Sequence, residues 1–338
     1  MNKRLLFIDA LRGMTMILVV YYHIINHCFP ETILDKGLQS FRMPLFFFVS
    51  GFIAFKESEF WTFRNTSLRL LKKFRVQVIP TAIFFSLYCY IFYYCNPLSF
   101  FLDYGWRHYW FTIVLFEFFV IYYLAMFLTR RNDKVNVMIV SSLIIVSVLL
   151  FHTTNKTGKW CIYTQFYAFL NYAPFFLLGT LARRFFKNIK KWIETWWILL
   201  VTVILFFIQL TIYDLSLNHS TPITPKAINF MIAWSMRITG MIMIFGLFVK
   251  FRNRFSTNGL VTRTLTFIGQ RTLDIYLLHF FFAAYTKQVF DLVTSYYSSL
   301  GRPFTIVATG LVVSGCLLLS AFIRKWKLAG KLLFGAKY

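Results

Sequence analysis

The sequence predicts an all-α protein, a polytopic bundle of transmembrane helices, and three observations support this fold class. Of its 338 residues, 58% are hydrophobic and 21% are aromatic, and the mean hydropathy is +0.62. Charged residues make up only 14% of the chain, whereas soluble domains carry about 25%. The apolar residues also gather in windows of about 20 residues, the length that a helix needs to cross a bilayer.

Ten such windows predict about ten membrane spans. The second is short and led by a proline, and the ninth is the least apolar because it contains Gln270, Arg271, Asp274 and His279. The predicted spans are residues 10–29, 42–56, 76–96, 109–128, 135–152, 166–182, 195–214, 227–249, 266–288 and 303–323.

The distribution of lysine and arginine predicts that both termini are cytoplasmic. With the N-terminus inside, the cytoplasmic segments hold 26 of the 36 basic residues and the external segments hold 8. Such a bias is the positive-inside rule of membrane topology. An odd number of spans would place the basic C-terminal segment outside and break the rule. We therefore expect a multi-pass protein of the cytoplasmic (inner) membrane.

Charge and cysteine content argue against other classes of protein. The net charge of +24 falls in short clusters between apolar runs, so we expect a lipid bilayer and not a nucleic acid as the partner. The five cysteines form no CxxC pair, which argues against a disulfide framework or a zinc site. His23 and His27 are four residues apart, but no third metal ligand has a suitable spacing, so no metal is expected. We expect one integral-membrane domain over residues 1–338, with the first span retained and no appended soluble domain.

The apolar first span contains two titratable residues, Arg12 and His23, and such groups within a membrane usually have a function. Arg12 and His23 are eleven positions apart, so in a helix they share one face, about 20° past three full turns, with roughly 16 Å of axial rise between them. An imidazole titrates near neutrality and can act as a general base. The alternative is that His23 only forms a hydrogen bond between helices.

Further titratable residues occupy later spans, where charged groups usually mark a site or a pathway. Glu117 in the fourth span could orient an imidazole or pair with Arg237 of the eighth span, or it could stay neutral because burial disfavours its charged form. Asp274 and Arg271 could neutralise each other at i, i+3. His279 lies in the same span.

A basic cluster, RLLKKFR at residues 69–75, precedes the third span. It could be a topology signal alone. It could also bind phosphate groups, since Lys and Arg are the phosphate-binding side chains.

Four stretches, in chain order, resemble motifs of one family, the acyltransferase-3 family of bacterial membrane O-acyltransferases. The first, FIDALRGMTMILVVYYH, resembles that family's opening motif, in which an Arg or Lys precedes a His by eleven positions. The second, FRMPLFFFVSGF, is similar to its MPLFFFLSGF-like segment, and the third, HYWFTIVLFEFF, to its aromatic fourth span. The fourth, IGQRTLDIYLLHFF, resembles its late GxxSLxIYLLH motif, with Thr272 in place of serine.

The resemblance implies transfer of an acyl group, most often acetyl, from cytoplasmic acyl-CoA to a hydroxyl of an envelope sugar or polysaccharide. It implies that His23 is the catalytic histidine and Arg12 its basic partner. The family's basic pair on the third span maps best to Lys72 and Arg75, although Pro80 follows at a longer spacing than the family pattern. Acetyl-CoA or another acyl-CoA is then a co-substrate and not a resident cofactor.

The proposed chemistry gives the spacing of Arg12 and His23 a purpose. A pantetheine arm measures on the order of 15–20 Å, comparable with the helical rise between the two residues. Arg12, Lys72 and Arg75 would hold the phosphates, and His23 would deprotonate the acceptor hydroxyl. Glu117 would fix the imidazole tautomer, as carboxylates do in catalytic triads.

His279, Arg237 and Tyr276 are further candidates for substrate binding or support of the site. Two other classes stay open. A transporter of an envelope glycan or small molecule also carries intramembrane charges and needs no acyl chemistry. A non-catalytic scaffold is the less favoured of the two classes, because a scaffold has no reason to place Arg12 and His23 on one face. The sequence does not distinguish direct transfer from an acyl-histidine intermediate.

Overall fold

The computed structural model describes eight segments of the chain, in which all regular structure is helical and no strand occurs. This confirms the all-α prediction. The described segments are residues 5–28, 31–56, 61–129, 132–154, 158–218, 225–256, 259–296 and 301–335.

The chain forms two compact units, and three helices (α2, α14 and α15) contribute segments to both. The first unit comprises residues within 1–49, 185–272 and 282–314, and the second those within 50–184, 273–281 and 315–338. The helices are α1 (Leu6–Cys28), α2 (Ile33–Ala54), α3 (Phe63–Lys73), α4 (Ile79–Tyr88), α5 (Pro97–Tyr104), α6 (Trp110–Leu128), α7 (Asp133–Thr153), α8 (Lys159–Thr164), α9 (Phe166–Arg184), α10 (Phe186–Ile193), α11 (Trp196–Asn218), α12 (Lys226–Lys250), α13 (Leu260–Gln270), α14 (Thr272–Tyr296), α15 (Gly301–Ile323) and α16 (Lys327–Phe334).

Eight helical segments of the described chain are long and apolar enough to cross a membrane, as a multi-pass protein requires. Helices cover the other two predicted spans as well, but α9 and α14 contain polar residues and are not among these eight. The count of ten spans and the cytoplasmic termini stay predictions. The eight segments are Leu6–Asn26, Ile33–Ala54, Phe63–Tyr93, Arg107–Leu128, Asp133–Phe151, Trp196–Ser216, Ala227–Lys250 and Pro303–Ile323.

The predicted ninth span is wrong as a single helix. Residues 266–288 divide at Arg271, whose backbone (φ −118°, ψ 22°) leaves the helical region between α13 and α14. The second span also begins earlier than predicted, at Ile33. Hydropathy does not detect these boundaries because a helix break or a polar first turn leaves the mean hydropathy of a window nearly unchanged.

The third span is longer than predicted, because the helix begins at Phe63 and continues for 31 residues to Tyr93. It includes two π-helical segments, Phe74–Val78 and Cys89–Tyr93. Its length of about 46 Å exceeds the roughly 30 Å of bilayer hydrocarbon. The basic residues of α3 can therefore lie beyond the hydrocarbon while α4 crosses it.

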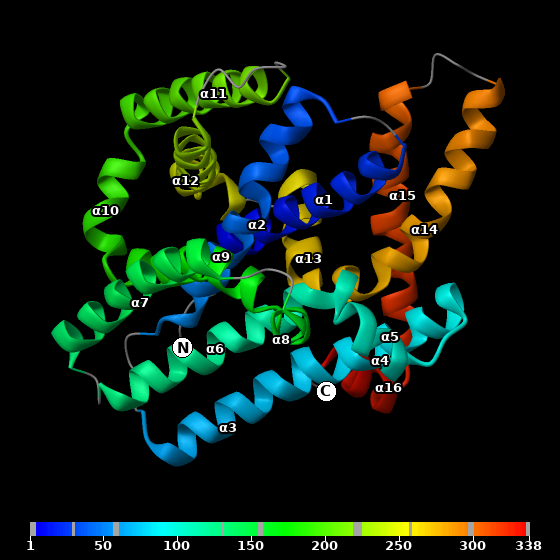
Figure 1. Cartoon of the computed structure of the whole chain (residues 1–338), viewed down its shortest axis with the longest axis horizontal. Helices are drawn as coiled ribbons and strands as arrows, with labels where there is room; N and C mark the ends of the chain where they lie inside the picture. Colours follow the sequence, from blue (N-terminus) through cyan, green and yellow to red (C-terminus); the bar gives the residue numbers. More distant parts are fainter. Residues whose placement is uncertain are drawn as a thin grey trace. The chain divides into compact units, whose positions relative to one another are not determined.

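In the first unit, α1 packs closely against α13 (Figure 1). Two glycines permit this approach. A Cβ atom on Gly13 would overlap the carbonyl oxygen of Leu265, and one on Gly269 would overlap that of Asp9. Small residues let helix backbones come together in membrane proteins, and here they fix how α1 is rotated against α13.

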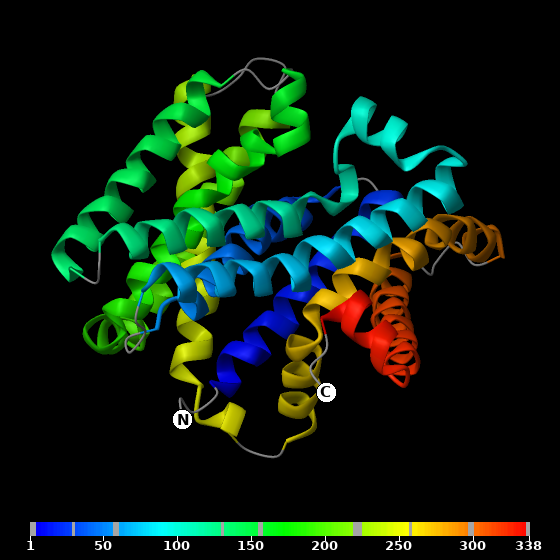
Figure 2. The same ribbon diagram turned by 90° about the horizontal axis from the view of Figure 1, so that it is seen from below.

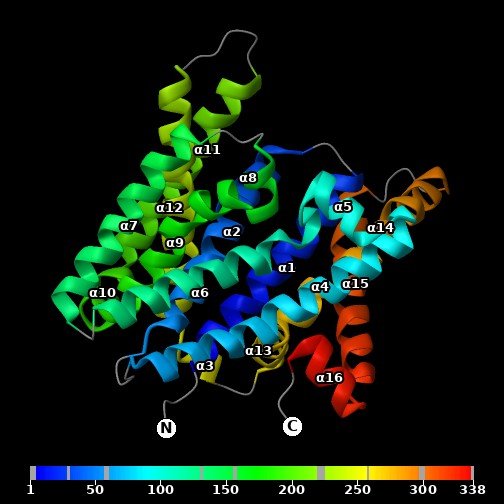
Figure 3. The same cartoon turned by 60° about the horizontal axis from the view of Figure 1, so that its bottom comes forward.

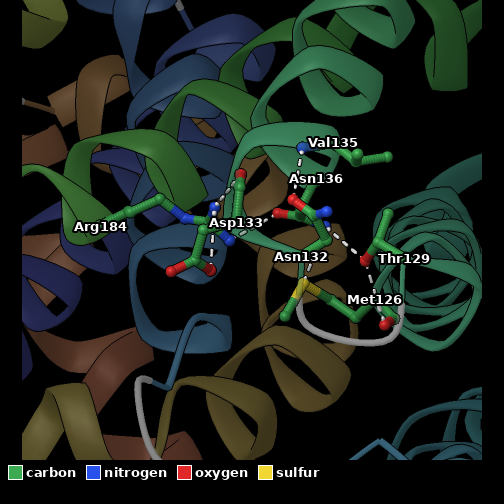
Figure 4. A network of polar contacts seen from close by, with 7 residues as sticks. All are labelled: Met126, Thr129, Asn132, Asp133, Val135, Asn136 and Arg184. Carbon is green, nitrogen blue, oxygen red and sulfur yellow. Dashed lines mark hydrogen bonds and ion pairs between the residues drawn. The ribbon is translucent and has the colours of Figure 1, made fainter.

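In the second unit, α6 runs beside the long α3–α4 helix, as Figures 2 and 3 show. A polar network joins α6, α7 and α9 at one end (Figure 4). Arg184 of α9 donates to the Asn136 side-chain oxygen (2.6 Å) and to the Asp133 carbonyl (2.9 Å). The Asn136 amide nitrogen in turn contacts the Met126 sulfur at 3.0 Å. The network holds three helix ends together through one buried asparagine.

The second unit also contains a buried ion pair that the sequence did not predict. The Asp274 carboxylate accepts hydrogen bonds from Arg324 Nε (3.0 Å) and Nη2 (2.9 Å), and from the Ser320 hydroxyl. The expected pairing of Asp274 with Arg271 is therefore wrong. Arg271 lies outside both helices, with its guanidinium over the Phe267 ring, so it is not one helical turn from Asp274.

We expect Gly13→Ala to lower the free energy of unfolding by about 2 kcal/mol or more, because the added methyl group would force α1 and α13 apart. Gly310→Ala in α15 is the matched control, since an added Cβ there meets no atom within 4 Å. Alanine is otherwise favoured over glycine within a helix by about 1 kcal/mol. Thermal unfolding of the purified protein in detergent measures both. Equal melting temperatures for the two variants would contradict the close approach.

Candidate active site

Arg12 is held by a residue 260 positions away in the chain. Its Nη2 donates a hydrogen bond to the Thr272 hydroxyl at 2.7 Å. Thr272 is the first residue of α14 and is buried. Because Gly13 and Gly269 fix α1 against α13, the side chain of Arg12 is directed at the junction of α13 and α14.

His23 lies on the same uninterrupted helix as Arg12, with roughly 16 Å of axial rise between them. Its side chain is half-buried, and its ring meets the Tyr22 ring edge-on at 6.0 Å. The structure thus places both predicted residues on one rigid element. The side chain of His27 lies outside the described part of the chain, and no group of three potential metal ligands occurs among the described residues.

A polar cluster next to His23 was missed from the sequence. The Tyr22 hydroxyl donates to Glu31 (2.8 Å) and accepts from the Gln39 amide (2.5 Å). The buried Arg42 guanidinium lies over the Tyr22 ring at 3.4 Å. Arg42 immediately precedes the MPLFFF stretch. A charged residue beside this apolar run was the sequence signal that could have identified the cluster.

The remaining candidate of the first unit is Arg237 on α12. It is half-buried, and its guanidinium lies 5.3 Å from the centre of the Trp234 ring.

Glu117 lies half-buried on α6 in the second unit. Among the described residues of that unit it has no hydrogen bond or ion pair. Its predicted partners, Arg237 and the imidazole of His23, belong to the first unit.

Tyr276 and His279 of α14 are both buried in the second unit. The Tyr276 hydroxyl accepts from the Phe111 N–H (3.3 Å) and donates to the His108 carbonyl (3.1 Å), so it caps the first turn of α6. His279 Nδ1 lies 2.8 Å from the Tyr276 carbonyl oxygen. A carbonyl oxygen only accepts, so this nitrogen carries the proton.

Lys72 and Arg75, the predicted phosphate-binding pair, are both exposed on the surface of the long α3–α4 helix. The other two basic residues of the cluster, Arg69 and Lys73, are half-buried.

A family model described as an acyltransferase domain matches residues 5–321, nearly the whole chain. The chain belongs to the acyltransferase-3 family. Searches of the curated proteins and of the solved structures found no significant match.

Three of the four acyltransferase-3 stretches contact one another, and the late motif takes part in both contacts. In the first unit, the opening motif on α1 meets the end of α13 through Gly13 and Arg12. In the second unit, the aromatic motif at the start of α6 meets α14, where Tyr109 donates to the Leu277 carbonyl at 3.1 Å and Tyr276 caps α6. The late motif therefore contributes residues to both units: Thr272 belongs to the first unit and the IYLLH segment to the second.

We expect Thr272→Val to lower the acyl-transfer rate by about tenfold, because the variant keeps the shape of threonine and loses the hydroxyl that accepts from Arg12. Thr272→Ser should transfer at close to the wild-type rate. Steady-state kinetics of the full chain in nanodiscs, with the melting temperature as a check on folding, measure the difference. Equal rates for the valine and serine variants would show that this hydrogen bond does not position Arg12.

Proposed function

We propose that this acyltransferase moves an acyl group, acetyl above all, from cytoplasmic acyl-CoA to a hydroxyl of an envelope sugar or polysaccharide, in the cytoplasmic membrane. The observation that carries the proposal is the geometry of α1. A cation and an imidazole share one face of a single rigid helix, separated by roughly the length of a pantetheine arm.

In this reaction His23 acts as the general base. Its imidazole takes the proton of the acceptor hydroxyl while the hydroxyl oxygen attacks the thioester carbonyl carbon. The tetrahedral adduct then collapses, the carbon–sulfur bond breaks, and the coenzyme A sulfur leaves with the proton that His23 held. Atoms and charge balance without any other reactant.

Positive charge binds the donor in this proposal. Arg12, oriented by Thr272, and the basic cluster at residues 69–75 of the long α3–α4 helix bind the phosphates of the donor nucleotide. Glu117, Arg237 and His279 are the candidates for tuning the imidazole or binding the acceptor. The Tyr276 hydroxyl donates to the His108 carbonyl just before α6 and accepts from the Phe111 N–H in its first turn, which favours a supporting role for it.

The Tyr22 cluster suits a polyhydroxylated acceptor. Glu31 and Gln39 are exposed and offer both acceptors and donors of hydrogen bonds, and both contact the hydroxyl of Tyr22, which immediately precedes His23 in the chain. Sugars are recognised through such bidirectional hydrogen bonding beside an aromatic ring.

His23→Ala should lower acetyl transfer by ~10²–10⁴-fold, the usual contribution of a general base. Transfer of radiolabelled acetyl from acetyl-CoA to envelope glycan by the full chain in nanodiscs measures the rate. Mass spectrometry of envelope polymers from cells with and without the protein identifies the acceptor.

Loss of one acetyl group per repeat in cells lacking the protein is the expected result. An unchanged envelope profile, together with full transfer by His23→Ala, would overturn the proposal and favour transport without acyl chemistry.

A further inference from the structure

The basic cluster of α3 presents two different faces. Arg69 and Lys73 are four residues apart and turn inward. The Arg69 guanidinium lies 5.0 Å from the centre of the buried Trp61 ring, and Lys73 Nζ lies 3.5 Å from the centre of the Phe119 ring on α6. Arg75 is two residues beyond Lys73, which rotates it by about 200° to the opposite face.

A π-helical turn follows this cluster. The N–H of Ile79 bonds to the carbonyl of Phe74, five residues back, so the turn contains one residue more than an α-helical turn. The extra residue explains the long spacing from Arg75 to Pro80. It also brings Gln77, a polar residue in an apolar stretch, to the buried side.

Three buried side chains on this inner side have a polar atom without a hydrogen-bond partner among the residues that the structure describes. They are Trp61 Nε1, Thr66 Oγ1 and Gln77 Oε1, on side chains no more than 8% exposed. Buried polar atoms in folded proteins are nearly always satisfied, by protein, water or ligand. Three such atoms along one face mark a place where water or a bound partner supplies the missing hydrogen bonds.

The order of these groups along the helix defines the chemistry of that partner. The Trp61 N–H, the Thr66 hydroxyl, Arg69 and Lys73 can all donate hydrogen bonds, and they come first. Gln77 Oε1 can only accept, and it lies roughly 6 Å beyond Lys73 and roughly 12 Å beyond Arg69 along the axis. The matching ligand has anionic oxygens at one end and an N–H donor about that far along an extended arm.

We propose that Arg69 and Lys73 bind the phosphates of acyl-CoA and that Gln77 accepts a hydrogen bond from an amide N–H of its pantetheine arm. This inference rests on the proposed function and reassigns the phosphate contacts from Lys72 and Arg75 to the inward pair. A glycerophospholipid headgroup shares the phosphate but has no amide donor at that distance. Gln77 therefore distinguishes the two sources of phosphate.

The first experiment compares the two faces of the helix. Binding of coenzyme A to the full chain in nanodiscs of zwitterionic lipid is measured for Arg69→Gln/Lys73→Gln and for the matched control Lys72→Gln/Arg75→Gln. We expect the inward double variant to weaken binding by at least about tenfold and the outward one by less than about twofold. Equal losses, or a larger loss for the outward variant, would overturn the assignment.

The second experiment tests Gln77 with fragments of the ligand. Gln77→Leu should fold at least as well as wild type, because it removes a buried acceptor without a partner. It should weaken binding of coenzyme A and pantetheine by about tenfold and leave binding of adenosine 3′,5′-bisphosphate unchanged. Gln77→Glu, which keeps an acceptor, should restore part of the loss. Unchanged pantetheine binding by Gln77→Leu would mean that water satisfies this oxygen, and the assignment of Gln77 would fall.

Three further outcomes separate this inference from the proposed function. If added phosphatidylglycerol displaces coenzyme A from wild type and binds through Arg69 and Lys73, the face is a lipid site and the inference falls. If wild type transfers acetyl from acetyl-CoA while Arg69→Gln/Lys73→Gln and Gln77→Leu both bind it normally, only the inference falls. If wild type binds no coenzyme A at all, the proposed donor falls, and the inference with it.

Discussion

The first unit depends on the contact between α1 and α13. Gly13 and Gly269 bring the two backbones so close that no side chain fits between them, and this sets the rotation of α1 about its axis. Arg12 follows Gly13 directly, so the same contact directs its guanidinium to Thr272. The position of His23 is then determined as well, because an unbroken helix transmits that rotation over three turns. A packing constraint between two glycines thereby orients both predicted reactive residues.

Properties that depend on neighbouring residues could be predicted from the sequence. Hydropathy located the helices, and the relation of Arg12 to His23 needed only the periodicity of one helix. Contacts between distant segments could not be predicted, because nothing local to Arg12 indicates Thr272, and nothing local to Asp274 indicates Arg324. The break at Arg271 was missed because it changes the backbone direction and not the composition.

The cluster on α3 shows a second limit of sequence reasoning. Its charge was evident, but which charges face inward depends on helix rotation, and a π-helical turn alters that rotation before Pro80. The polar residues Thr66 and Gln77 were the signal that could have identified the inner side, since both lie one or two turns from Arg69 or Lys73 on the buried face. A motif match transfers residue types between proteins, whereas an inserted residue can change the face on which they lie.

The salt bridge of Asp274 bears on where this domain ends. The region shared with the family stops at residue 321, yet Arg324, which neutralises the buried Asp274 carboxylate, follows three positions later. Beyond it, Phe334 of α16 packs on Phe84 of α4. An expression fragment that ended at residue 321 would lack Arg324 and would leave the buried Asp274 carboxylate without its positively charged partner. The minimal stable protein therefore extends beyond the region that matches the family model, residues 5–321.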